Sequence, residues 1–272
     1  MILNEILTQK RRDLEELKVR FPIDRLRQVA AHKTRSNPRS FKRSLGASRG
    51  LNLICEIKKA SPSEGILRED FQPLRIAGMY EFAGACAISV LTEPHFFKGR
   101  PSYLKTVRQV TSLPILRKDF LFESYQIYET ALLEADAFLL IASILTDSEL
   151  ASLIAIGQDL GMDPLVEVHS EEDLKKALDA GAEIIGINNR DLKTLTVDVM
   201  RAKRLLPHIP KGKWVVVESG FSHHEELMEY KSLGVHGFLV GTAIMKAPDI
   251  PEKISELLGT SRKWRKAEGE AP

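Results

Sequence analysis

Acidic, basic and amide side chains recur directly after short apolar segments of this 272-residue chain. Lysine and glutamate at such positions could donate and accept protons, which suits acid–base work on a carbonyl substrate. One such charge alone is equally compatible with an exposed loop or a structural ion pair, but repetition at equivalent positions indicates one site. The candidates are Glu56, Lys58, Lys118, Glu167, Asn188, Arg190, Glu218 and Ser219.

Two glycine-containing segments in the last quarter of the chain could bind a phosphate group. They cover residues 218–221 and 240–243 and include Gly220 and Gly241. Backbone N–H groups at glycines can approach an anion closely, and the residues from Thr242 onward can begin a short helix whose positive end faces it. Two ordinary turns are the alternative interpretation, but glycines in both segments favour phosphate binding.

The elements that would position these residues are short β-rich apolar runs that alternate with longer amphipathic stretches. This alternation is typical of βα units, and runs that are apolar almost throughout indicate strands covered on both faces. The runs lie about 20 to 34 residues apart, and eight of them predict a TIM (β/α)8 barrel with its site at the carboxyl ends of the strands. The runs cover residues 51–57, 85–91, 114–117, 137–141, 164–168, 183–187, 214–218 and 237–240.

Residues 1–50 do not fit this repeat and are predicted to form an amino-terminal helical extension that caps the barrel. Residues 2–21 have the pattern of a charged amphipathic helix, and residues 32–50 are basic and rich in turn formers. A solvated face explains the basic residues better than nucleic-acid binding, because the segment lacks the interleaved aromatic pattern of such binders. The barrel is expected over residues 51–260, with a loose tail at 261–272, and the whole chain is expected to be one domain.

Composition excludes several classes of protein. The chain is 43% hydrophobic and 28% charged, as in ordinary globular proteins, and its formal net charge of +2 is too small to indicate nucleic-acid or membrane binding. Its two cysteines, Cys55 and Cys86, lie in apolar runs and are expected to be buried rather than paired or bound to metal. No apolar run approaches the ~20 residues of a membrane span, and no secretory signal is visible, so a cytoplasmic enzyme is expected.

Residues 56–65, with the sequence EIKKASPSEG, closely resemble the highly specific first-strand signature of indole-3-glycerol-phosphate synthases. Other segments resemble this family in the same order over almost the whole chain, including the amino-terminal extension. The resemblance implies an enzyme of tryptophan biosynthesis that converts 1-(2-carboxyphenylamino)-1-deoxyribulose 5-phosphate into indole-3-glycerol phosphate, CO2 and water, with no metal or organic cofactor. The other segments are residues 89–99, 114–120, 124–129, 135–145, 165–169, 186–192, 217–221 and 237–245.

The resemblance also implies catalytic roles. Lys118 matches the general acid that protonates the ketone oxygen, and we expect burial or neighbouring cations to lower its pKa. A structural ion pair with Asp119 or with a neighbouring loop is the alternative role for Lys118. Glu167 matches the family's fifth-strand catalytic glutamate, while Lys58 and Glu56 match the pair associated with the substrate carboxylate and the dehydration. The residues that match those holding the anilino and hydroxyl groups are Asn188 and Glu218.

Substrate-binding roles follow from the same resemblance. The residues that match the phosphate site are Ser61, Arg190, Gly220, Gly241 and Thr242, with Ser219 beside the reacting part of the substrate. Thr242 stands where serine is common in the family and keeps its hydroxyl group. The residues expected to line an apolar pocket for the benzene ring are Phe97, Phe120 and Leu139, although simple core packing is the alternative for these three.

Two other functions stay open at this stage. One is another phosphate-binding barrel isomerase or lyase, such as phosphoribosylanthranilate isomerase with its cysteine and aspartate; Cys55 precedes Glu56 and should face the opposite side of the strand. The other is a catalytically silent phosphosugar-binding protein, which would not need both lysines and all three strand-end glutamates. We expect a monomer with one phosphorylated small-molecule substrate, at most weak association with other tryptophan-pathway enzymes, and no nucleic-acid or membrane partner.

Overall fold

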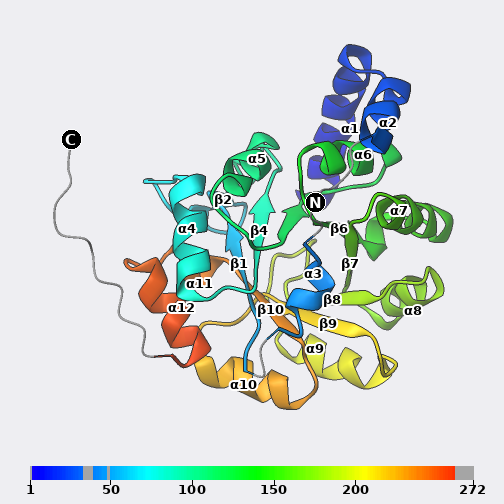
Figure 1. The fold of residues 1–272 in the computed structure, drawn as a ribbon. Helices are drawn as coiled ribbons and strands as arrows, with labels where there is room; N and C mark the ends of the chain where they lie inside the picture. The colour runs from blue at the N-terminus through cyan, green and yellow to red at the C-terminus, as the bar shows by residue number, and fades with distance from the viewer. Residues whose placement is uncertain (1, 33–38, 48–49, 261–272) are drawn as a thin grey trace, which may run out of the picture.

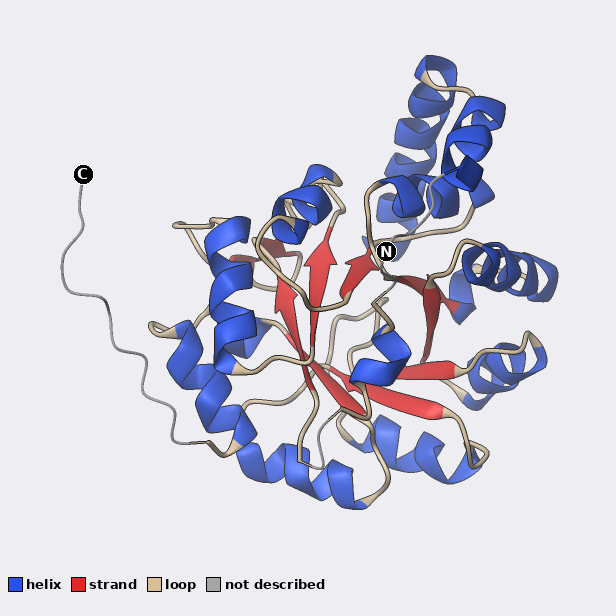
Figure 2. Cartoon of the chain, in the orientation of Figure 1, coloured by secondary structure: helices blue, strands red, loops and turns tan. Residues whose placement is uncertain are grey.

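The computed structural model describes residues 2–32, 39–47 and 50–260, in which eight strands close into a parallel barrel surrounded by helices (Figure 1, Figure 2). Each barrel strand pairs with the next one along the chain, and β1 closes the ring by pairing with β10. The prediction of a (β/α)8 barrel is confirmed. The barrel strands are β1 (Leu53–Ile57), β4 (Ala87–Leu91), β5 (Ile115–Lys118), β6 (Ala137–Ile141), β7 (Asp163–Val168), β8 (Ile184–Asn188), β9 (Trp214–Glu218) and β10 (Gly237–Val240).

Helices cover the outer face of the barrel, and short elements decorate its loops (Figure 2). The helices that follow the strands are α4 (Pro73–Ala83), α5 (Ser102–Arg108), α6 (Ser124–Leu132), α7 (Asp147–Asp159), α8 (Glu171–Asp179), α9 (Met200–Leu205), α10 (His224–Ser232), α11 (Thr242–Met245) and α12 (Ile250–Leu258). The short elements are the two-stranded sheet of β2 (Ala60–Ser61) and β3 (Gly65–Ile66), and the 3-10 turns Ala142–Ile144 and Leu206–His208. The amino-terminal helices are α1 (Ile2–Arg20), α2 (Ile23–His32) and α3 (Phe41–Ser44).

The predicted strand boundaries need small corrections. Three runs match their strands residue for residue, and the others differ by one or two residues. Lys118 and Asn188 were expected just after their strands, but they are the last residues of β5 and β8. The reason is that the ladder extends to them, because Lys118 pairs with Leu91 and Asn188 pairs with Glu218.

Strand alternation decides which side chains face the inside of the barrel. Residues such as Ile54, Leu116 and Leu165 form one buried cluster inside the ring of strands, whereas their sequence neighbours pack in a second cluster with the surrounding helices. Two residues further along each strand, the side chain returns to the same face. The inward series therefore ends in Glu56 on β1, Lys118 on β5, Glu167 on β7 and Glu218 on β9. The chemically active ends of the strands converge for this reason.

The amino-terminal helices contact both ends of the barrel. Phe41 and Leu45 of the α3 region are buried in the inner cluster, and the backbone N–H of Lys42 donates to Asp163, the first residue of β7, at 2.9 Å. Helix α1 contributes Leu3 to the same cluster, and α2 packs against α6 (Figure 1). Division of the chain at residue 50 stays a prediction.

Three further expectations concern the cysteines, the membrane and the tail. Cys55 is fully buried in the outer cluster, as expected from its position before Glu56, but Cys86 is only half-buried because it lies just before β4 at the end of the barrel. Within residues 2–32, 39–47 and 50–260, no helix combines the length and apolar character of a membrane span. The predicted tail at 261–272 and parts of the basic segment, 33–38 and 48–49, lie outside the described residues.

Candidate active site

A cavity of about 460 Å³ opens at the carboxyl ends of the strands. Every residue that the sequence analysis selected for the site lines this cavity. They are Glu56, Lys58, Ser61, Phe97, Lys118, Phe120, Leu139, Glu167, Asn188, Arg190, Glu218, Ser219, Gly220, Gly241 and Thr242. Their positions agree with one site, and the role of each residue stays a prediction.

Lys118 lies at the centre of the polar part of this cavity. Its Nζ is 3.1 Å from Glu167 Oε2 and 3.1 Å from Glu218 Oε2. Both glutamate side chains are 1% exposed and the lysine side chain is 13% exposed, so little water screens these charges. An ion pair between Lys118 and Asp119 is not formed, because Asp119 pairs with Lys10 and Arg117 instead. Among the described residues, the partners of Lys118 are strand residues and not residues of a neighbouring loop.

The expected lowering of the Lys118 pKa is also wrong. Burial acts to lower the pKa of Lys118, but the carboxylates of Glu167, Glu218 and Glu56 outweigh burial and raise it well above its ordinary value. Burial acts in the expected direction, but three strands bring anions rather than cations to this lysine. Lys118 therefore stays an ammonium at neutral pH and is a strong source of positive potential.

The pKa values of the two glutamates beside Lys118 are shifted in opposite directions. Burial acts to raise the pKa of Glu167, but Lys118 and His169 outweigh it, so this pKa is lowered. For Glu218, burial together with repulsion from Glu167 and Glu56 outweighs the attraction of Lys118 and raises its pKa to about 7. Two carboxylates of the same strand-end type can thus carry different charges near neutral pH.

Glu218 is held in an unusual environment. Neither of its carboxylate oxygens receives a well-aligned hydrogen bond from the described residues, although both are buried. A Cβ at position 186 on the neighbouring strand would lie 2.8 Å from Glu218 Oε1, so the carboxylate would have to shift to accommodate a side chain there. Gly186 therefore makes room for this carboxylate inside the barrel.

Glu56 and Lys58 form a second ion pair at the mouth of the barrel, with Lys58 Nζ 2.7 Å from Glu56 Oε2. The Glu56 carboxylate occupies the space where a side chain at position 241 would begin, because a Cβ on Gly241 would collide with it. Gly241 was selected for phosphate contact alone. The structure adds a second reason for glycine at this position, namely clearance for Glu56.

The predicted phosphate residues lie on the segments that follow β1, β8, β9 and β10 and line the cavity. Gly241 is the N-cap of α11, the short helix that the sequence analysis expected from Thr242. Ser219 and Gly220 both have left-handed backbone conformations, with φ of +67° and +89°, which turns the chain sharply after β9. Arg190 Nη1 donates to Leu195 O at 2.8 Å and reaches Ser63 Oγ at 3.4 Å, so the guanidinium is held at the rim.

Aromatic rings form the apolar end of the cavity. The ring centroids of Phe97 and Phe120 are 6.2 Å apart in a tilted arrangement, and Leu139 is 2% exposed beside them. The loop that carries Phe97 is held by the buried carboxylate of Glu93, which accepts hydrogen bonds from the N–H groups of Phe96 at 2.7 Å and Phe97 at 2.9 Å. The pocket is therefore preformed.

His169 and Lys10 are two residues near the site that were not predicted from the sequence. His169 Nε2 lies 3.3 Å from Glu167 Oε1, on the side of that carboxylate opposite Lys118. The sequence signal was available, because His169 directly follows the strand that ends at Val168. Lys10 interrupts the apolar stripe of α1, where the charged residues of the segment had been assigned to a solvated face.

Metal binding was not expected from the sequence. No group of three or more histidine, cysteine, aspartate or glutamate residues in the described part of the chain is arranged to hold an ion. The acidic side chains at the barrel mouth are paired with Lys58 and Lys118. Independence of the reaction from metal stays a prediction.

Comparisons with known proteins agree with the geometry. The family model described as indole-3-glycerol phosphate synthase matches residues 3–257. The indole-3-glycerol phosphate synthase of Campylobacter curvus is 45% identical over 259 residues, which cover 94% of this chain and 99% of that protein. The protein of the same name from Acetivibrio thermocellus is 46% identical over 256 residues, covering 94% and 98%. Among solved structures, KGPDC from Streptococcus mutans has a TM-score of 0.60 at 15% identity, covering 77% of this chain and 96% of that chain, and shows likeness of fold alone.

Proposed function

The chain belongs to the indole-3-glycerol phosphate synthase family of tryptophan biosynthesis, and we propose that its barrel-mouth cavity carries out ring closure with Lys118 as the general acid. The substrate is 1-(2-carboxyphenylamino)-1-deoxyribulose 5-phosphate, and the products are indole-3-glycerol phosphate, CO2 and water. One observation supports this assignment above the others: the Lys118 ammonium lies between two buried carboxylates at the floor of the cavity.

Ring closure begins when the ring carbon that bears the carboxylate attacks the ketone carbon. The new carbon–carbon bond forms as the carbonyl electrons move to the oxygen, and Lys118 donates a proton to that oxygen. An alkoxide is a much stronger base than an amine, so a lysine with a raised pKa still gives up its proton at this stage. Its charge also stabilises the developing negative charge in a site with little water.

Decarboxylation and dehydration complete the reaction. Loss of CO2 leaves its bonding electrons in the ring and restores aromaticity, and loss of the hydroxyl group with a neighbouring proton gives water and the indole double bond. We assign the substrate carboxylate and the leaving hydroxyl to Lys58 and Glu56. These two residues form an ion pair with an Nζ–Oε2 distance of 2.7 Å and line the same cavity. Glu167 contacts Lys118 at 3.1 Å, and its lowered pKa makes it the proton acceptor that we assign beside the acid.

The remaining residues bind and orient the substrate. We assign its phosphate to the glycine-rich end of the cavity. We assign its benzene ring to the end formed by the rings of Phe97 and Phe120. The residues for the phosphate end are Ser61, Arg190, Ser219, Gly220, Gly241 and Thr242, those for the aromatic end are Phe97, Phe120 and Leu139, and those for the anilino and hydroxyl groups are Asn188 and Glu218. A cysteine-based isomerase is not favoured, since Cys55 is fully buried on the helix-facing side of β1.

Replacing Lys118 by methionine tests the assignment of the acid. We expect kcat to fall by ~10²–10⁴-fold, the usual contribution of a general acid, with KM changed little because the phosphate and aromatic ends are intact. Lys42→Met is the matched control, because Lys42 also forms an ion pair, with Glu183 at 2.5 Å, but at the opposite end of the barrel. Retention of more than about a tenth of the parental kcat by a folded Lys118→Met protein would pass the role to Lys58.

We also propose a monomeric, cytoplasmic enzyme with at most weak association with other tryptophan-pathway enzymes. The family implies a phosphorylated small molecule as substrate. Light scattering of the purified protein at micromolar concentration tests the oligomeric state, and a dimer mass would contradict the proposal.

A further inference from the structure

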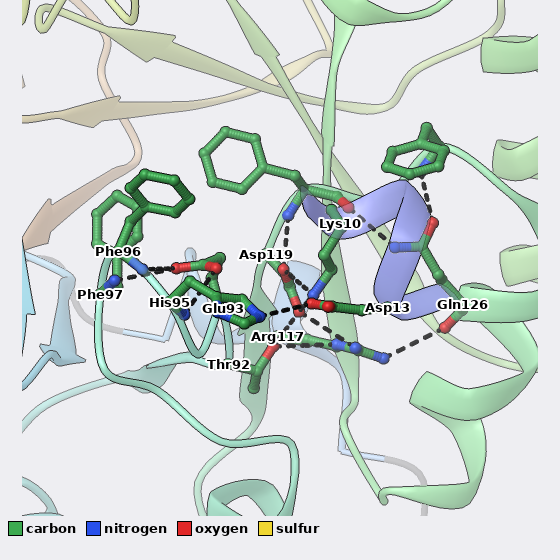
Figure 3. Close-up of polar contacts among 12 residues, drawn as sticks. Lys10, Asp13, Thr92, Glu93, His95, Phe96, Phe97, Arg117, Asp119 and Gln126 are labelled. Atoms are coloured by element: carbon green, nitrogen blue, oxygen red, sulfur yellow. Dashed lines mark hydrogen bonds and ion pairs between the residues drawn. The ribbon is translucent and has the colours of Figure 1, made fainter. Parts of the chain in front are cut away.

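The buried face of α1 carries a lysine in the middle of an apolar stripe. Leu3, Ile6, Lys10 and Leu14 are the buried residues of this helix, at the spacing of one helical face. A buried ammonium is costly unless a counterion compensates it. The Lys10 Nζ lies 2.7 Å from Asp119 Oδ1 and 2.8 Å from Asp119 Oδ2, so it contacts both oxygens of one carboxylate (Figure 3).

Asp119 is the centre of a buried polar network at the end of β5. Thr92 Oγ1 donates to its Oδ2 at 2.5 Å, and Arg117 Nη2 donates to the same oxygen at 3.2 Å (Figure 3). The N–H of Phe120 donates to Oδ1 at 2.9 Å. Burial acts to raise the pKa of Asp119, but Lys10 and Arg117 outweigh it and lower it. The carboxylate is therefore ionised and holds two strands and α1 together.

The charges of this network balance only when Lys10 is present. Arg117 is 1% exposed and also pairs with Glu129 at 2.8 Å, which gives two cations and two anions in contact. Without Lys10, the two carboxylates would share one guanidinium. An uncompensated buried charge moves its surroundings or takes up a proton, and either change alters the contacts of Asp119.

Asp119 lies between the proposed acid and the aromatic end of the cavity. It stands between Lys118 and Phe120, and all three residues line the cavity. The N–H of Thr92 donates to the carbonyl oxygen of Lys118 at 3.1 Å. Thr92 therefore contacts Lys118 through the backbone and Asp119 through its hydroxyl group. A shift of the Asp119 carboxylate therefore moves the backbone that carries the Lys118 ammonium.

We propose that Lys10 is a positioning residue for ring closure, acting through Asp119 to hold the Lys118 ammonium and the Phe120 ring in place. This inference rests on the proposed function of Lys118 as the acid. Lys10 does not line the cavity, so its effect falls on the chemical step rather than on phosphate binding. Displacements of about 1 Å in an acid can slow a reaction by ~10²-fold, and we expect Lys10→Met to slow ring closure by about 10- to 100-fold.

A matched control separates this role from general tethering of α1. Lys18 lies on the same helix and also ties it to the barrel, with its Nζ 2.5 Å from Glu123. Its other partner, Glu15 at 2.9 Å, lies on α1 itself, and Lys18 does not touch the network of Asp119. The measurement is the single-turnover rate constant with saturating enzyme in excess over substrate, because an unfolded fraction of the enzyme then leaves this rate constant unchanged. Thr92→Val is a second variant that removes one hydrogen bond to Asp119 and no charge.

We expect a 10- to 100-fold slower single turnover for Lys10→Met, with a KM within about twofold of the parental KM. Thr92→Val should slow the single turnover less. Lys18→Met should keep a rate within about twofold of the parental rate. Equal rates for Lys10→Met and Lys18→Met would overturn the proposal. If Lys10→Met does not fold, the Thr92→Val protein tests the proposal in its place. A single-turnover rate for Thr92→Val equal to the parental rate would then overturn the proposal. An active Lys118→Met protein would instead refute the proposed acid, whatever Lys10 does.

Discussion

Replacing Glu218 by glutamine should stabilise the protein at pH 8 while it reduces activity. The Glu218 carboxylate is fully buried without a well-aligned hydrogen bond from the described residues, and Glu167 and Glu56 repel it. Its pKa is raised from an ordinary value of 4.5 to about 7, a balance that already includes the attraction of Lys118. Glutamine has nearly the same shape and carries no charge. The variant therefore resembles the protonated glutamate.

The expected gain in stability of Glu218→Gln follows from the linkage between protonation and folding. A raised carboxyl pKa means that the folded protein binds this proton more tightly than the unfolded chain, so ionisation of Glu218 costs stability as the pH rises from 4.5 to 7. At 1.36 kcal/mol per pKa unit, the full cost above pH 7 is about 3 kcal/mol, and it disappears below pH 4.5. For a domain of this size, we expect a melting temperature roughly 6 to 12 °C above that of the parent at pH 8.

The assay is a series of urea and thermal melts of both proteins from pH 4.5 to 8. Glu167→Gln is the matched control, because Glu167 is also 1% exposed and also contacts Lys118, but its pKa is lowered. Its charge supports the fold above pH 4.5 and this support is lost only at lower pH, so Glu167→Gln should be less stable than the parent at pH 8. A Glu218→Gln protein that is no more stable than the parent at pH 8, or whose advantage does not depend on pH, would refute this reasoning.

Two other predictions concern the substrate-binding end of the cavity. Arg190→Ala should raise KM about tenfold or more with little change in kcat, because it removes a charge-assisted contact remote from the bonds that change; an unchanged KM in steady-state kinetics would show that Arg190 does not bind the phosphate. Gly241→Ala should lower kcat as well as raise KM, since the new Cβ displaces the Glu56 carboxylate; a pure KM effect would contradict the proposed part of Glu56 in dehydration.

Strand alternation explains why so much of the site could be predicted. The run 214–218 is apolar on both faces until its last residue, so the charge at position 218 lies at the mouth of the barrel. Side chains alternate along a strand, and Glu218 therefore faces inward like Val216, two residues before it. The same reasoning separated Glu56 from Cys55. These inferences need only local sequence and the closure of the barrel.

The remaining features depend on contacts between distant segments. The raised pKa of Lys118 arises from glutamates on three other strands, and local sequence does not reveal how near they approach. The steric role of Gly241 likewise depends on the rotamer of Glu56. Lys10 was different, since its position within the stripe of Leu3, Ile6 and Leu14 was visible from helical spacing alone. A lysine on an apolar face predicts a buried counterion, and only the structure identifies Asp119 as that counterion.

Fluorescence of the indole product is the most direct test of the central claim. Purified protein, treated exhaustively with EDTA, is mixed with 1-(2-carboxyphenylamino)-1-deoxyribulose 5-phosphate, and indole emission is followed with time beside the Lys118→Met protein. We expect emission to rise with the parent protein at the same rate with and without EDTA, and to stay at baseline with the variant. No emission from folded parent protein, or emission only after magnesium or zinc is added, would contradict the account.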